Sequence, residues 1–291
     1  YKVHSDGIQY GLKGIDVTLG DAFLQHIQLL YQKGYYRFVP VYPAKNGQIM
    51  VLRGRKLYYL MPWLPNQRPT ESDTMKYMFR ELARLHGVTT KEIDNTVESI
   101  NSHYGKVRLL WIREMDMFDQ FMEMCERKVY MSPFEGEFVQ YYHEIIKAYE
   151  YALDQLKNWK ETASTREKIR VALCHSSFLP DHFVFDERGY GHFINMEKCK
   201  WSMPFKETLP YLIQSLRSYP KKGEHWVNWI FHYMKYYPLR EDEKYLFKSY
   251  LAHPGHFLQT LRKYQERKII NHELEMTKRL QKNYWLFKNI E

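Results

Sequence analysis

The apolar pattern of this chain changes at the proline-flanked segment Pro62–Pro65, and that change constrains the fold more than any other feature. Before this segment, short runs of β-branched and aromatic residues alternate with turn residues around one helical pattern, Asp21–Lys33. After it, apolar residues recur every three or four positions along most of the chain. The sequence therefore predicts a small β-rich part followed by a larger, mainly helical part.

The predicted elements follow a recognisable order. Strands are expected over Lys2–His4, Ile8–Lys13, Phe38–Tyr42, Ile49–Leu52 and Leu57–Met61. Helical stripes are expected over Met75–Leu85, Val107–Cys125 and Tyr142–Leu156, and in five segments after Glu207, the last being Asn271–Phe287. Between them, Val171–Cys174, Phe183–Phe185 and His192–Ile194 are β-rich, and Asp186–Gly189 supplies the turn of a hairpin.

This order predicts an α+β fold with two lobes, of the protein-kinase-like type. The expected domains are a small lobe over residues 1–61, a linker over 62–68 and a helical lobe over 69–291, which contains the loop and hairpin 171–197. The chain begins at Tyr1 without a methionine or a signal-peptide pattern, so further residues are expected upstream; a glycine-rich loop of the kinase type would lie before Tyr1, where this sequence does not show it.

Composition excludes several other classes of protein. With 44% hydrophobic and 26% charged residues, the chain of 291 residues has ordinary globular usage. No apolar run is long enough to span a membrane, so we expect no membrane partner. The three cysteines, Cys125, Cys174 and Cys199, form no Cys-x-x-Cys pair, which argues against disulfides and against a zinc site and favours a reducing compartment.

Charge and aromatic content suggest contacts with other proteins rather than with nucleic acid. The net charge is +9, but most basic stretches, such as Lys221–Lys222 and Arg267–Lys268, are short. The excess of basic residues over Gln259–Glu291 is typical of a solvated helix face, so a nucleic-acid partner is not expected; steep salt dependence of binding would reveal one. The 25 tyrosines supply amphipathic contact area at little entropic cost.

The most informative stretch is Cys174–Phe185, which can be aligned with the H-x-D-x-x-x-x-N loop of kinases and small-molecule phosphotransferases. In that alignment the histidine is His175, the catalytic base falls on Ser177, and the metal-binding asparagine falls on His182. The metal-binding aspartate beyond the hairpin falls on Asn195. All of the matched carboxylate positions are therefore occupied by residues without a carboxylate.

Two further segments extend the alignment. Leu82–His86 is similar to the L-A-x-L-H helix of aminoglycoside and choline kinase relatives, and Tyr10–Lys13 is similar to the strand with the phosphate-anchoring lysine. With Leu57–Trp63 as the interlobe segment, the chain resembles the bacterial spore coat protein S family of kinase-like proteins, from about Tyr10 to about Leu212. The resemblance implies synthesis in the mother-cell cytoplasm, deposition in the spore coat, and other coat proteins as partners.

The departures from the kinase pattern predict a pseudokinase. Mg²⁺ prefers carboxylate oxygens, which the matched positions lack, and loss of a general base alone lowers rates about 10²–10⁴-fold. Lys13 is the candidate phosphate anchor, but no glutamate follows it before Gly34, so its usual ion-pair partner is expected to be missing. We therefore expect a structural or interaction component of the coat with no active catalytic residue, no metal and no cofactor.

Two alternatives remain open at this stage, and a third is discounted. Asp181 or Glu197 replaces the lost acids, which would give an ATP-dependent phosphotransferase that uses Mg-ATP; Glu197 is the better candidate because it is in phase with Asn195 along the chain. His182 and Asn195 bind a softer metal together with one of these acids. The third, in which Ser177 is a hydrolase nucleophile with His175 or His182, is discounted because the chain has no G-x-S-x-G elbow.

Overall fold

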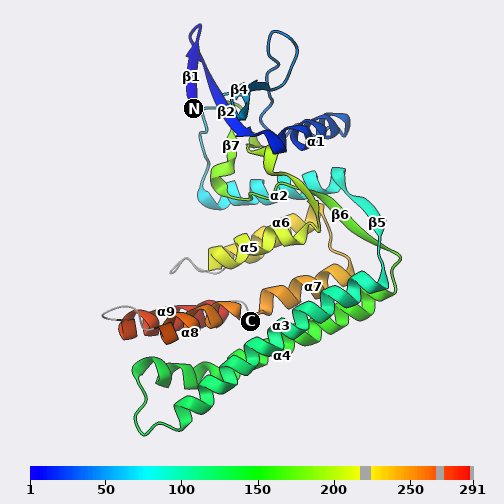
Figure 1. The fold of residues 1–291 in the computed structure, drawn as a ribbon. Helices are drawn as coiled ribbons and strands as arrows, with labels where there is room; N and C mark the ends of the chain where they lie inside the picture. The colour runs from blue at the N-terminus through cyan, green and yellow to red at the C-terminus, as the bar shows by residue number, and fades with distance from the viewer. Residues whose placement is uncertain (217–223, 267–271, 289–291) are drawn as a thin grey trace. The chain divides into compact units, whose positions relative to one another are not determined.

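The computed structural model describes residues 1–216, 224–266 and 272–288, and contacts within it divide the chain into two compact units (Figure 1). The first unit consists of Tyr1–Glu92, Arg170–Tyr211 and Glu224–Pro238. The second unit consists of Ile93–Ile169, Leu212–Gly223 and Leu239–Glu291. Both units are therefore built from segments that are distant in sequence, and the predicted boundary at residue 61 stays a prediction.

A four-stranded antiparallel sheet opens the first unit. Its strands are β1 (Lys2–Ser5), β2 (Ile8–Asp16), β3 (Val51–Arg53) and β4 (Lys56–Pro62), in the order β1-β2-β4-β3. Asp6 and Gly7 join β1 to β2 with φ angles of 51° and 75°, which is the left-handed backbone that a two-residue hairpin turn needs. Helix α1 (Gly20–Gln32) buries Phe23 and packs it on Tyr59 of β4, with ring centroids 5.0 Å apart.

The strand predicted at Phe38–Tyr42 is wrong. The structure has two isolated bridges there, one parallel between Phe38 and Phe193 and one antiparallel between Tyr42 and Leu60. Pro40 interrupts the segment, and because proline has no backbone N–H, it cannot donate to a continuous ladder. Instead, the Val39 N–H donates to the Phe193 carbonyl at 2.8 Å, which ties this segment to the hairpin that follows the predicted loop.

The rest of the first unit surrounds that hairpin, β7 (Phe183–Phe185) and β8 (Gly191–Phe193). Helix α2 (Glu71–Thr89) begins at the Thr70 N-cap. The helical stripe predicted for α2 is fully buried, and its members are Met75, Met78, Phe79, Leu82 and Leu85. Helix α6 (Glu224–Tyr236) packs on α2, with Trp229 stacked on Phe79. The first unit is completed by strand β9 (Lys200–Ser202), by residues 170–174 of its antiparallel partner β6 (Lys168–Cys174) and by residues 205–211 of helix α5 (Phe205–Leu216).

The second unit is a helical assembly. Helices α3 (Val97–Glu126) and α4 (Pro133–Ser164) form a long pair, which runs side by side in Figure 1. Helices α7 (Glu241–Ala252), α8 (Gly255–Glu266) and α9 (His272–Lys288) pack around this pair. Strand β5 (Lys91–Asp94) lies where the chain passes from the first unit to the second. No helix within the described ranges is long and apolar enough to cross a membrane.

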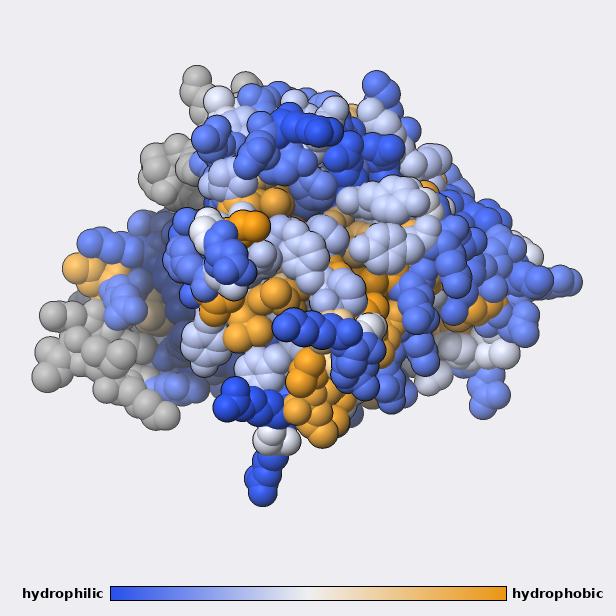
Figure 2. All heavy atoms as spheres, turned by 90° about the horizontal axis from the view of Figure 1, so that it is seen from above, coloured by the Kyte–Doolittle hydropathy of each residue, from blue (hydrophilic) through white to orange (hydrophobic). Residues whose placement is uncertain are grey.

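Two of the basic stretches singled out in the sequence, Lys221–Lys222 and Arg267–Lys268, lie outside the described residues, as does Asn271 at the start of the last predicted helix. On the described surface, hydrophobic side chains lie between hydrophilic ones, as Figure 2 shows for one face. The exposed aromatic side chains include nine tyrosines, which are Tyr1, Tyr31, Tyr36, Tyr42, Tyr77, Tyr130, Tyr151, Tyr190 and Tyr236.

Candidate active site

Lys13 has an acidic partner, although it does not come from the segment before Gly34, where the usual glutamate is missing. The partner is Glu197, 184 positions further along the chain. The Lys13 Nζ atom donates to Glu197 Oε1 and also to Asn195 Oδ1. Tyr59 donates its hydroxyl to the second carboxylate oxygen, Oε2, at 3.0 Å. Both oxygens of this buried carboxylate are therefore bonded within the protein.

The strand register explains this arrangement. Lys13 lies in β2 directly opposite Tyr59 in β4, so the two side chains share one face of the sheet. Glu197 lies in a single 3₁₀ turn, Met196–Lys198, directly after Asn195. Burial and the adjacent Glu197 carboxylate raise the pKa of the Tyr59 hydroxyl well above its ordinary value, so this tyrosine stays a proton donor.

Asn195 adopts the left-handed backbone conformation, with φ 65° and ψ 33°. Asparagine tolerates this region better than most residues with a Cβ. The turn lets the side chains of Asn195 and Glu197 meet at the same ammonium group. The cavity beside Asn195 and Tyr59 measures about 10 Å³, which is roughly enough for one water molecule.

His175 is a fully buried residue that joins the predicted loop to the end of the hairpin. Its Nε2 atom lies 2.6 Å from the Ile194 carbonyl, and because a carbonyl only accepts, Nε2 carries the proton. Burial lowers the pKa of the imidazole, so the ring is neutral near pH 7. Its Nδ1 atom has no hydrogen-bond partner in the part of the chain that the structure describes. His175 therefore acts as a structural strut in this arrangement.

Ser177 and His182 are brought together by the loop. The Ser177 hydroxyl lies 2.9 Å from His182 Nδ1, and the Ser177 carbonyl lies 2.8 Å from the same nitrogen. Since the carbonyl can only accept, Nδ1 carries a proton and donates it. A protonated Nδ1 cannot take a proton from the hydroxyl, so this geometry does not activate Ser177 as a nucleophile. The hydrolase alternative loses its general base.

Asp181 lies apart from this network. Its side chain is 87% exposed and pairs with Arg68 at 3.2 Å. In the described ranges, the ligand atoms of His182, Asp181 and Glu197 do not converge as a metal site requires. Of the two displaced acids considered from the sequence, the structure brings Glu197 beside Asn195 and leaves Asp181 at the surface.

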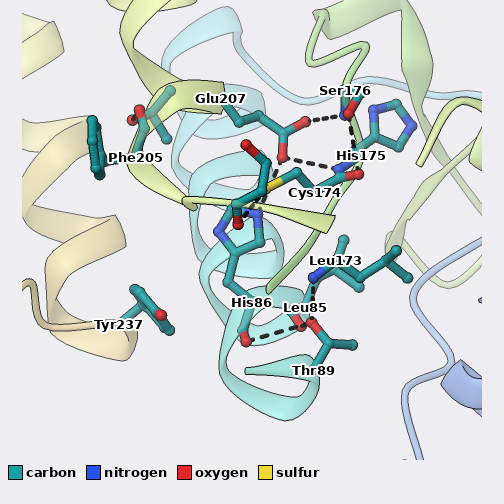
Figure 3. A network of polar contacts seen from close by, with 12 residues as sticks. Leu85, His86, Thr89, Leu173, Cys174, His175, Ser176, Phe205, Glu207 and Tyr237 are labelled. Atoms are coloured by element: carbon teal, nitrogen blue, oxygen red, sulfur yellow. Dashed lines mark hydrogen bonds and ion pairs between the residues drawn. The ribbon is translucent and has the colours of Figure 1, made fainter. Parts of the chain in front are cut away.

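Glu207 of α5 holds the loop backbone and was missed by sequence reasoning. Its carboxylate accepts the backbone N–H of His175 at 2.9 Å and of Ser176 at 2.5 Å (Figure 3). Ser176 has a φ of 62°, a left-handed conformation that is unfavourable for a residue with a Cβ by about 1–2 kcal/mol. The two charge-assisted hydrogen bonds help to offset this strain.

His86 extends the same network from α2. Its Nε2 atom lies 3.1 Å from Glu207 Oε2, and its Nδ1 atom lies 2.7 Å from the Tyr233 hydroxyl of α6. Thr89, one turn further along α2, accepts the N–H of Leu173 at 3.1 Å (Figure 3). The histidine of the L-A-x-L-H segment therefore connects two helices to the predicted loop.

His86, Cys174 and Glu207 are the three side chains whose ligand atoms converge within 4.8 Å in the described part of the chain. A soft metal can use such a set. Each member already has a protein partner, however: Glu207 binds two N–H groups, His86 binds Tyr233, and the Cys174 thiol faces the Ser202 carbonyl at 3.7 Å. Burial and Glu207 raise the pKa of the Cys174 thiol. Hydrogen bonding accounts for this cluster without a metal.

The comparisons with known proteins rest on structure. No sequence-family model and no curated protein matches the chain. An aminoglycoside phosphotransferase from Alicyclobacillus acidocaldarius superposes with a TM-score of 0.69 at 13% identity, over 100% of this chain and 91% of that protein. A spectinomycin phosphotransferase matches with a TM-score of 0.49 at 13% identity, over 99% and 88% of the two chains. A choline kinase from Streptococcus pneumoniae matches with a TM-score of 0.44 at 14% identity, over 97% of this chain and 88% of that protein.

The chain therefore has the α+β, protein-kinase-like fold of aminoglycoside phosphotransferases, with a small sheet at its N-terminus and a large helical part. This confirms the fold class that the order of elements predicted. At 13% identity the likeness carries the fold and no activity.

Proposed function

We propose that this protein is a pseudokinase: a kinase-fold protein that does not transfer phosphoryl groups and acts through contacts with other proteins. The observation that carries the proposal is that the positions matched to the catalytic base and the metal ligands hold Ser177, His182 and Asn195, none of which has a carboxylate. Lys13 is the residue aligned with the phosphate anchor, and its ammonium group is neutralised by a buried carboxylate. A lysine–glutamate ion pair is also part of active kinases, so this pair by itself does not argue against nucleotide binding.

Two further observations support the proposal. Phosphoryl transfer depends on positioning and on Mg²⁺, which prefers carboxylate oxygens. The nearby acid, Glu197, has one oxygen bonded to Lys13 and the other to Tyr59. The cavity beside it, about 10 Å³, is far below the roughly 300 Å³ at which ligand pockets begin.

The cellular role that we propose comes from the resemblance to the spore coat protein S family. The protein would be made in the mother-cell cytoplasm and deposited in the coat, with other coat proteins as partners. The exposed tyrosines suit such contacts because tyrosine is enriched in protein interfaces. Detection of this protein by antibody in spore coat extracts would support this role. Detection in the mother-cell lysate alone would exclude it.

Mg-ATP binding tests the pseudokinase proposal directly. A ligand at 100 times its dissociation constant stabilises the folded state by about 2.7 kcal/mol, which for a chain of this size corresponds to roughly 5–10 °C in melting temperature. We expect Mg-ATP at about 5 mM to shift the melting temperature of this protein by less than about 1 °C. A shift of several degrees that EDTA abolishes would overturn the proposal.

A phosphotransferase with displaced acids is the second candidate, because Glu197 and Asn195 meet at Lys13. ATP hydrolysis by the wild type that disappears in Glu197→Ala, but persists in the exposed-site control Glu187→Ala, would favour this candidate. For the pseudokinase we expect no turnover in the wild type. We also expect none in Ser177→Asp, because residues of a catalytic unit act non-additively and His182 and Asn195 remain.

A further inference from the structure

A cavity of about 510 Å³ lies inside the second unit, away from the kinase-like site. Helix α4 contributes Ala148 and Tyr151 to its lining, α7 contributes Leu251, and α9 contributes Phe287. This volume falls within the range of about 300–1,000 Å³ that is typical of small-molecule sites, and such sites are mostly apolar, as this one is. The cavity is therefore large enough for an extended apolar group.

The polar side chains of the cavity carry an unbalanced positive charge. Lys147 of α4 and Lys248 of α7 both line it. The one acidic lining residue, Glu144, is paired with Lys288 at 3.2 Å, so its charge is already neutralised. Within the described ranges, neither Lys147 nor Lys248 has an acidic partner. Two unpaired ammonium groups at an apolar cavity favour a ligand that is apolar at one end and anionic at the other.

From this combination, we propose that the second unit binds a medium-chain carboxylate, with the alkyl chain against Ala148, Leu251 and Phe287 and the head group near Lys147 and Lys248. The apolar walls account for affinity, because each buried methylene contributes about fourfold to the binding constant. The lysines account for the sign of the head group. The proposal does not depend on whether the kinase-like site binds nucleotide, because that site belongs to the first unit.

Isothermal titration calorimetry of the full chain with dodecanoate below its micellar concentration tests the proposal. Dodecyltrimethylammonium has the same tail with the opposite charge, and octanoate has the same head group with a shorter tail. We expect dodecanoate to bind, octanoate to bind about 10²-fold more weakly, and the ammonium compound to bind at least about threefold more weakly.

Three variants locate the site. Lys147→Gln and Lys248→Gln should each weaken dodecanoate binding by only about three- to fivefold, because both lysine side chains are exposed to solvent. The matched control is Lys157→Gln, an exposed lysine of the same helix that does not line the cavity, and it should leave the affinity unchanged. Ala148→Trp should abolish binding by filling the cavity, provided that its circular dichroism spectrum and melting remain native.

Clear outcomes would overturn the proposal. These are no binding of dodecanoate, equal binding of both head groups, or equal loss in Lys157→Gln and the two cavity variants. If Ala148→Trp does not fold, the lysine variants and the tail-length series still decide the question. Enzyme activity at the site of Lys13 would neither support nor contradict carboxylate binding by the second unit. Failure of dodecanoate to bind would in turn leave the pseudokinase proposal unchanged.

Discussion

Replacing Glu207 should destabilise the protein more than replacing any exposed glutamate, because its carboxylate satisfies two backbone N–H groups of the loop. A hydrogen bond to a charged group contributes about 1.5–3 kcal/mol. Glu207→Ala removes both, so we expect a loss of about 3–6 kcal/mol. Glu207→Gln keeps one acceptor and turns an NH₂ group toward the other N–H, for an expected loss of about 2–4 kcal/mol.

Urea unfolding measures the global effect, and hydrogen exchange of the His175 and Ser176 amides measures the local one. The control is Glu187→Gln, which makes the same chemical change at an exposed position of the hairpin turn and should stay within about 0.5 kcal/mol of the wild type. If Glu207→Gln is as stable as this control, or if the two amides keep their protection from hydrogen exchange, the hydrogen bonds of Glu207 do not hold the loop.

Three other predictions follow from buried groups. Burial lowers the pKa of His175 in the folded protein, so the unfolded chain takes up a proton before the folded one as the pH falls. The free energy of unfolding should therefore decrease below pH 6.5 by up to about 1.4 kcal/mol per pH unit. In His175→Gln, the urea midpoint should vary less between about pH 5 and pH 7 than it does in the wild type. All three cysteines are buried and burial raises the pKa of Cys174, so native protein should show no fast thiol with Ellman's reagent at pH 8; one fast thiol would contradict this. Gly191→Ala should destabilise by about 1–3 kcal/mol because its Cβ would lie 2.2 Å from the Phe183 ring, whereas Gly87→Ala, with open space in α2, should stabilise by about 0.5–1 kcal/mol in the same denaturation assay.

The long helices were predictable because their apolar stripes repeat over many turns. The stripe that includes Met75 and Leu85 is buried along its whole length, as its spacing predicted. The strand predicted at Phe38–Tyr42 was wrong because β-propensity alone does not take into account that Pro40 has no backbone N–H to donate. The segment therefore forms isolated bridges instead of a continuous ladder. Short strands such as β9 carry too few residues for any pattern, so only their pairing with β6 reveals them.

The candidate site was predictable only in part, for a related reason. His175, Ser177, His182 and Asn195 lie in one loop and hairpin, where spacing along the chain is informative. The kinase pattern places the acidic partner of such a lysine before Gly34, whereas the partner of Lys13 lies 184 positions away. Glu207 gave no signal either, since a single glutamate at the start of a helix is common. Only the fold brings such residues together.

The sequence separation between Lys13 and Glu197 also has a consequence for synthesis in the cell. The lysine and its glutamate are 184 positions apart, and ribosomes add about 5–20 residues per second. The small sheet ends at Pro62, so its synthesis is complete roughly 7–27 s before the carboxylate that neutralises its lysine exists. During that interval Tyr59 also lacks the acceptor for its hydroxyl, and the apolar face that α1 covers has no neighbouring hairpin. A nascent chain stalled before Glu197 should thus be a substrate for chaperones or proteases, whereas one stalled after Glu207 has both acidic partners in place.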